Sequence, residues 1–227
     1  MKNNIFILLA LVLFGCNSSS SKEAEEPVAA ERAHIKESAD GSNAPISQAN
    51  EQKAEKPINT FTSEPSIIAE DFFDWYAGVT NNQETNEYQA KFVADKEGMM
   101  TLDYTQYIAN LRRLHFSEEL INQEVENYSN CINSIKSFKY AEREKHLEEI
   151  EDYESIGCDF FNSFRWTKSM DNFDGARVIG EEIKGNSAEV KVQLYNYDAG
   201  KKEFYYWNEP YMVKLKKDNG KWEIVNL

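Results

Sequence analysis

Few residues of this chain combine the types and the spacing that catalysis or metal binding requires. The 227 residues include three histidines, and His115 and His146 have no ligand-spaced neighbours. No histidine stands in a context that indicates a Cys–His nucleophilic pair, and the sequence contains no GxxxxGK[ST] phosphate loop and no GxSxG nucleophile elbow. We therefore expect no catalytic residue, no cofactor and no metal ion, and we expect that the protein is not an enzyme.

One stretch partly matches a calcium-binding loop. Asn172, Asp174 and Glu181 stand at ligand positions of that pattern. Met170 takes the first position, where a carboxylate should begin the coordination, and residues 177–183 have the pattern of a strand where an exiting helix is required. We interpret this stretch as a solvated turn.

Aromatic side chains are the remaining candidates for a binding surface, at 13% of the sequence. Most of them should pack in the core, and the others could line a pocket for an apolar or sugar-like ligand or form a partner-binding patch. The candidates for such a pocket or patch are Trp75, Tyr76, Trp166, Tyr195, Tyr197 and Tyr206.

The amino terminus predicts a lipoprotein signal peptide at residues 1–15. Lys2 precedes an apolar run at residues 5–14, which as a helix would rise about 15 Å, half the thickness of a bilayer core. The run ends in Leu-Phe-Gly-Cys, which resembles a bacterial lipobox whose cysteine, here Cys16, is acylated and becomes the new amino terminus. The alternatives are an ordinary cleaved signal peptide with a chance cysteine, or a buried apolar helix.

The lipobox resemblance implies that acylated Cys16 anchors the chain to a lipid bilayer. Acyl chains such as palmitate contribute about 0.8 kcal/mol for each buried methylene, so several of them hold a protein durably. Asn17 follows the cysteine in place of the aspartate typical of inner-membrane retention. We therefore expect a location in the bacterial cell envelope, at the outer membrane and facing the periplasm.

Composition separates a tether from a globular domain. We expect residues 16–63 to form the acylated cysteine and a disordered tether, because residues 17–60 contain no aromatic side chain and too little apolar area to offset chain entropy. Residues 64–227 are expected to form one globular domain. From Ser66 onward 19 basic side chains stand against 30 acidic ones, a net charge of −11. That charge disfavours binding to nucleic acid.

Cys131 and Cys158 are the two cysteines of the globular domain. In an oxidising compartment they could form a disulfide, which would stabilise the fold by roughly 3.5 kcal/mol in the chain-entropy model. Alternatively, Cys131 lies on the apolar stripe of a predicted helix and would be a small buried hydrophobe. The sequence leaves both alternatives open.

Apolar periodicity predicts helices first and strands last. The spacing of Ile68, Phe72 and Val79 predicts a helix after Pro65. Three further helices are expected at residues 103–114, 117–135 and 139–153. Period-two patterns then predict strands at residues 177–183, 188–197, 203–206, 211–217 and 221–227, joined by short turns. The expected fold class is α+β, with the N-terminal helices packed on a C-terminal curved antiparallel meander.

Both ends of this domain resemble the nuclear transport factor 2-like superfamily, in particular its uncharacterised envelope-lipoprotein branch. The resemblance lies in Phe-Phe-Asp-Trp-Tyr at residues 72–76 and in the two strands at residues 211–217 and 220–226. It implies a cone-like domain whose curved sheet wraps the first helix around a pocket. It does not indicate what fills that pocket, because enzymes, binders and adaptors share the fold.

The sequence therefore leaves two functions open. The first is a non-enzymatic protein-interaction module whose acidic domain binds an envelope protein, either as an accessory subunit or as an immunity-type inhibitor of a basic toxin. The alternative is a pocket-type binder, or less favoured a small enzyme, for a hydrophobic envelope metabolite. A closed apolar inner face of the sheet would contradict the second function, whereas an open cavity with an aspartate or a tyrosine would support it.

Overall fold

The computed structural model describes residues 56–227, which belong to one compact unit. The predicted signal peptide, Cys16 and the tether as far as residue 55 lie outside the described residues. None of the helices between Lys56 and Leu227 is long and apolar enough to cross a membrane. The described part mixes helices with antiparallel sheets, so the expected α+β class is confirmed.

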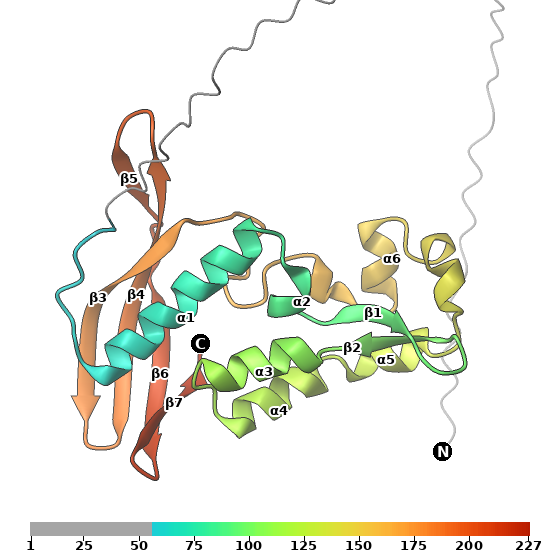
Figure 1. Cartoon of the computed structure of the whole chain (residues 1–227), viewed down its shortest axis with the longest axis horizontal. Helices are drawn as coiled ribbons and strands as arrows, with labels where there is room; N and C mark the ends of the chain where they lie inside the picture. Colours follow the sequence, from blue (N-terminus) through green and yellow to red (C-terminus); the bar gives the residue numbers. More distant parts are fainter. Residues whose placement is uncertain (1–55) are drawn as a thin grey trace, which may run out of the picture. The chain divides into compact units, whose positions relative to one another are not determined.

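The first helix, α1, spans Glu64–Asn81 and confirms the helix predicted after Pro65. Ser63 caps its start, because the Ser63 side chain accepts a hydrogen bond from the backbone N–H of Ser66. Phe72, Phe73 and Tyr76 on the apolar face of α1 are fully buried. This helix is therefore the main apolar element that packs on the sheet (Figure 1).

A five-stranded antiparallel sheet occupies the C-terminal third, and its order is β3-β4-β6-β7 with β5 on β4. The short strand β5 pairs with residues 195–198 of β4, and β6 pairs with residues 187–192 along the same side of β4. After β4 the chain therefore runs back along one edge of β4 as two separate strands, β5 and then β6. The strands are β3 (Gly175–Lys184), β4 (Ser187–Asp198), β5 (Glu203–Tyr206), β6 (Tyr211–Asp218) and β7 (Lys221–Asn226).

The inner face of the sheet is closed. Ala188, Val190, Val192 and Leu194 alternate along β4 with polar residues, and all four are at most 2% exposed. They pack with the buried aromatic side chains of α1 in one continuous core. The inward-facing side chains at residues 188–194 of β4 are therefore packed against the core and line no open space.

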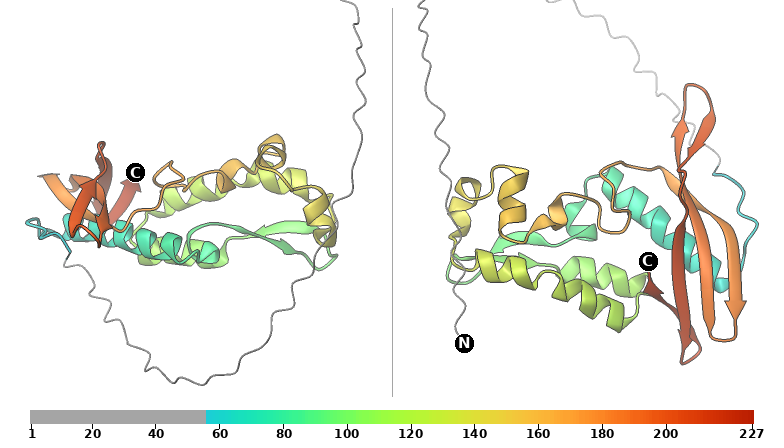
Figure 2. Two further views of the ribbon diagram at one scale, coloured as in Figure 1. Left: turned by 90° about the horizontal axis from the view of Figure 1, so that it is seen from above. Right: turned by 180° about the vertical axis from the view of Figure 1, so that it is seen from behind.

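Short helices and a two-stranded hairpin form the rest of the domain (Figure 2). The hairpin of β1 and β2 is antiparallel and pairs Phe92 with Leu102. The elements are α2 (Thr85–Tyr88), β1 (Lys91–Ala94), β2 (Met100–Asp103), α3 (Thr105–Arg113), α4 (Glu118–Glu126), α5 (Ser129–Ile135), the 3₁₀ helix η1 (Tyr140–Lys145), α6 (Ile150–Ser155) and the 3₁₀ helix η2 (Asp159–Phe161).

Two helix predictions were wrong in extent. The helix predicted at 117–135 is interrupted between α4 and α5, where a turn at Asn127 and Tyr128 replaces the regular helix and the N–H of Tyr128 donates to the carbonyl of Val125. The helix predicted at 139–153 is divided into η1 and α6. The helix α6 begins at Ile150 because the side chain of Asp152 accepts hydrogen bonds from the backbone N–H groups of Glu148 and Glu149, which precede it.

Candidate functional site: the hairpin aromatic face and the rim pocket

The hairpin of β4 and β5 projects past the rest of the sheet (Figures 1 and 2). Four rings share one face of it, because Tyr195 pairs with Tyr206 and Tyr197 pairs with Phe204 in the strand register. The ring of Phe204 lies 5.2 Å from that of Tyr195 and 4.9 Å from that of Tyr197. Tyr195, Tyr197, Phe204 and Tyr206 are called the hairpin aromatic face below.

Asp198 holds the tip of this hairpin in shape. Its Oδ1 accepts hydrogen bonds from the backbone N–H groups of Gly200 at 2.9 Å and Lys201 at 3.0 Å. Such a side-chain closure replaces backbone pairing in the turn. The aromatic face therefore stands on a braced hairpin.

Arg177 of β3 extends the aromatic face. Its guanidinium lies 3.7 Å from the ring centroid of Tyr206, a cation–π contact. Its terminal nitrogen donates to Gln193 Oε1 at 2.8 Å, which holds the guanidinium in place. Tyrosine and arginine are two of the residue types enriched at the centres of protein interfaces.

Tyr195 reaches over the beginning of β3. Gly175 faces Tyr195 in the register, and a Cβ atom at residue 175 would lie 2.4 Å from the hydroxyl oxygen of Tyr195. The ring can occupy this position because residue 175 has no side chain. Burial, with the nearby Asp74 carboxylate, raises the pKa of Tyr195 to about 12, so the hydroxyl stays protonated near neutral pH.

Beside the aromatic face lies a pocket of about 550 Å³, called the rim pocket. It is formed by α1, the start of β3, the hairpin and Lys56. The residues that line it are Lys56, Asp74, Gly78, Asn81, Asp174, Tyr195, Tyr197 and Phe204.

The polar wall of the rim pocket is held by several hydrogen bonds. Asp74 Oδ1 accepts from the backbone N–H of Ala176 at 3.1 Å, and its other oxygen pairs with Lys56. Asp174 Oδ2 accepts from the backbone N–H of Tyr197 at 2.7 Å. Burial raises the pKa of Asp74 despite the opposing effect of Lys56. Three rings beside fixed carboxylates could hold a small polar ring, with one face stacked and its edge hydrogen-bonded.

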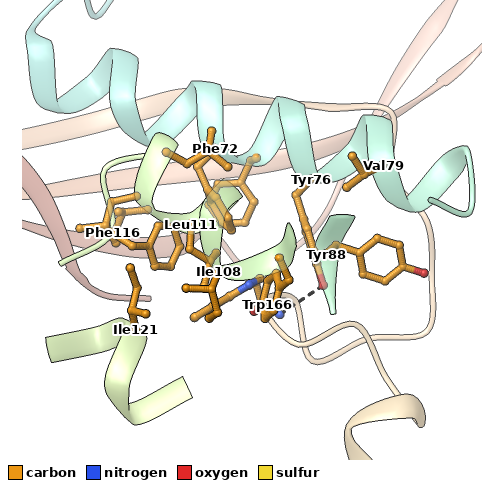
Figure 3. Close-up of a cluster of buried hydrophobic side chains, with 14 of the residues drawn as sticks. Phe72, Tyr76, Val79, Tyr88, Ile108, Leu111, Phe116, Ile121 and Trp166 are labelled. Atoms are coloured by element: carbon orange, nitrogen blue, oxygen red, sulfur yellow. Dashed lines mark hydrogen bonds between the residues drawn. The ribbon is translucent and has the colours of Figure 1, made fainter. Parts of the chain in front are cut away.

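The structure places the six predicted aromatic residues in three different locations. Tyr195, Tyr197 and Tyr206 come together on the hairpin aromatic face. Tyr76 and Trp166 lie in the core, where the Tyr76 hydroxyl accepts a hydrogen bond from the backbone N–H of Trp166 at 3.5 Å (Figure 3). Trp75 is half-buried against Phe72 and lines a separate hollow of about 260 Å³.

Cys131 and Cys158 are joined by a disulfide, with their Cα atoms 4.7 Å apart. Both residues are completely buried. The bond ties α5 to the residue that precedes η2. It therefore fixes the start of the irregular segment that leads to Arg165 and Trp166.

Sequence reasoning missed much of the rim pocket. Asp74 and Asn81 occupy polar positions of α1, and Lys56 falls in the stretch assigned to the tether, yet Lys56 pairs with both Glu70 and Asp74. Phe204 follows the period-two pattern of its strand and could have been found from it. No sequence pattern indicates that Lys56, Asp74 and Asn81 line a pocket, because segments distant in the sequence bring them together.

The residues of the partial calcium pattern do not converge. Asp174 lies at the rim pocket, whereas Glu181 accepts a hydrogen bond from Ser66 Oγ at 2.6 Å near the start of α1. Within residues 56–227 no group of three or more histidine, cysteine, aspartate or glutamate side chains is placed to hold a metal ion.

Comparisons with known proteins do not indicate a family or a function for this chain. No family model matches the chain, and no curated protein matches it. A solution structure of a SEC-C motif containing protein from Rhodopseudomonas palustris is 13% identical and covers 52% of this chain and 85% of that chain, with a TM-score of 0.20. A likeness at this TM-score carries no argument about fold or function.

Replacement of Gly175 by alanine is expected to push the Tyr195 ring out of the rim pocket and to cost about 1–3 kcal/mol of stability, because the core edge is overpacked. The pKa of Tyr195 should then fall towards that of a solvated tyrosine, as measured by NMR of ring-labelled tyrosine. Gly180→Ala is the matched control, since its nearest neighbour would be Lys191 Cδ at 3.7 Å. An unchanged Tyr195 signal in Gly175→Ala would contradict the described contact.

Proposed function

We propose that this protein is a lipid-anchored lipoprotein of the bacterial envelope whose acidic domain is a non-enzymatic protein-interaction module. The observation that carries the proposal is the hairpin aromatic face, which stands on a projecting hairpin and is extended by Arg177. Tyrosine rings and an arginine on a projecting, braced element are the usual anchors of a protein interface. The partner docks on this face.

The charge of the domain indicates the chemistry of the partner. The net charge of −11 from Ser66 onward attracts a basic surface and raises the rate of encounter. At the hairpin itself Asp174, Asp198 and Glu203 lie together with Arg177, Lys201 and Lys202, so this attraction comes from the charge of the whole domain. The partner is therefore a basic envelope protein, bound either as a complex to which this chain is accessory or as a toxin that it neutralises.

The anchor and the domain shape complete the proposal. The lipobox ending at Cys16 supports attachment to the outer membrane, facing the periplasm. The resemblance of residues 72–76 and 211–226 to the nuclear transport factor 2-like superfamily supports a cone-like domain. In this domain the inner face of β4 is packed against the core, which favours a docking role for the projecting hairpin.

The test is crosslinking in intact cells with tagged full-length protein, followed by mass spectrometry. We expect one reproducible basic partner, lost in the Tyr197→Ala/Phe204→Ala variant and retained in Tyr140→Ala, a control at an exposed tyrosine of η1. We also expect Cys16→Ala to leave the membrane fraction, and association of the purified pair to slow as salt increases. Equal capture by the hairpin variant and the native chain would contradict the proposed surface.

A second candidate function rests on the rim pocket. Its volume of about 550 Å³ and its three rings suit a small ligand with an apolar or sugar-like ring. Ligand binding at about 100 times Kd would raise the free energy of unfolding by roughly 2.7 kcal/mol, which a thermal-shift screen detects. A hit abolished by Asp74→Asn, with partner capture unaffected, would favour this function over the first.

A further inference from the structure

A second pocket, of about 390 Å³, lies between the junction of α4 with α5 and the loop that follows η2. Its walls include the rings of Tyr128 and Phe160, and its floor includes the carboxylate of Glu124, which is 1% exposed. Arg165 and Lys168 contribute positive charge to the same pocket. They face two carboxylates, those of Glu124 and Asp159, in the same pocket.

Glu124 holds the guanidinium of Arg165 in a fixed position. Arg165 Nε donates to Glu124 Oε2 at 2.6 Å, and the arginine side chain remains 38% exposed. Among residues 56–227 the two terminal nitrogens of Arg165 make no hydrogen bond. These nitrogens form the fork that binds carboxylate and phosphate groups in pairs.

The backbone brings Lys168 back to the same side. Lys168 has a φ of +51°, an uncommon value for a residue with a side chain, and its N–H donates to the carbonyl of Phe164 at 2.7 Å. The N–H of Phe164 in turn donates to the carbonyl of Ser169 at 2.8 Å. In the part of the chain that the structure describes, the Lys168 ammonium has no ion-pair partner. Lys168 and Arg165 thus line one pocket, where, among residues 56–227, the ammonium has no ion-pair partner and the terminal guanidinium nitrogens make no hydrogen bond.

From this arrangement we propose that the pocket binds a small-molecule oxyanion, a phosphate or a carboxylate group. Arg165 holds it through its terminal nitrogens, Lys168 supplies the second positive charge, and Tyr128 and Phe160 contact the apolar part of the ligand. Asp159 also lines the pocket and limits the negative charge that the ligand can carry. This site is separate from the hairpin aromatic face and does not depend on its function.

The test is calorimetric titration of the full chain, in mild detergent, with inorganic phosphate and with succinate at constant ionic strength. We expect one of the two anions to bind, and the tighter one identifies the group. Lys168→Glu should weaken binding about tenfold or more, because the charge near the anion is reversed. Asp159→Asn should strengthen it. Lys216→Glu on β6, an exposed lysine with the same change of charge, is the control.

Circular dichroism would verify that the Lys168→Glu chain is folded, which we expect because its side chain is exposed. Absence of binding of both anions to the native chain would overturn the proposal. Equal weakening by Lys168→Glu and Lys216→Glu would overturn it too, because the anions would then respond only to the overall charge of the protein.

Discussion

Replacement of Glu124 by alanine should lower the free energy of unfolding by about 3–5 kcal/mol, because it leaves buried donors and a charge without their partner. The carboxylate of Glu124 accepts hydrogen bonds from Tyr107 Oη at 3.1 Å, Tyr128 Oη at 3.3 Å and Arg165 Nε at 2.6 Å. These donors lie on α3, beside α5 and in the loop after η2. One carboxylate thus joins three segments of the chain.

The two tyrosines are effective donors at this site. Burial raises the pKa of Tyr107, and the negative charge of Glu124 raises it further. Tyr128 is shifted in the same direction for the same two reasons. Both hydroxyls therefore keep their protons at neutral pH, and removal of Glu124 leaves both without this acceptor.

Urea unfolding followed by tryptophan fluorescence measures this loss, and Glu126→Ala is its control. Glu126 is an exposed glutamate of the same helix, so its replacement should change stability by less than about 0.5 kcal/mol. The loss of stability in Glu124→Gln should lie between those of Glu124→Ala and Glu126→Ala, because the oxygen of the amide can still accept a hydrogen bond from one tyrosine. Equal unfolding midpoints for the Glu124→Ala and Glu126→Ala chains would contradict the role given to this carboxylate.

Loss of the disulfide should destabilise the domain by about 3.5 kcal/mol, because the unfolded chain gains the freedom that a cross-link over 27 residues removes. Replacement of both Cys131 and Cys158 by alanine, and reduction of the native chain, should have the same effect. Hydrogen exchange should increase most in residues 158–168, since the disulfide fixes the start of that segment and the loop supplies Arg165 to Glu124.

The control for the disulfide is the double-alanine chain treated with reductant. Its unfolding midpoint should not change, whereas that of the native chain should decrease. A native chain whose unfolding is the same with and without reductant would show that the two thiols are not bonded in solution. Cys16 does not affect this comparison, because it is common to both chains.

The sequence by itself predicted the elements whose burial is regular along the chain. The apolar stripe of α1 and the alternation of Ala188, Val190, Val192 and Leu194 in β4 are local patterns, because each element buries one face. The turn between β3 and β4 was predicted as well, since Gly185 supplies the positive φ of 59° that a two-residue turn needs. These features follow from the 3.6-residue period of a helix, from the two-residue period of a strand and from the residue types that turns require.

Only the tertiary structure decided where the aromatic and charged side chains meet. Tyr76 and Tyr197 were equal candidates in the sequence, yet the first is buried in the core and the second lies on a projecting hairpin. Arg165 and Glu124 are 41 residues apart, and no local pattern relates them. The division of the fourth predicted helix and the interruption between α4 and α5 have the same origin. Packing between segments distant in the sequence outweighs local propensity, so these contacts depend on the whole fold.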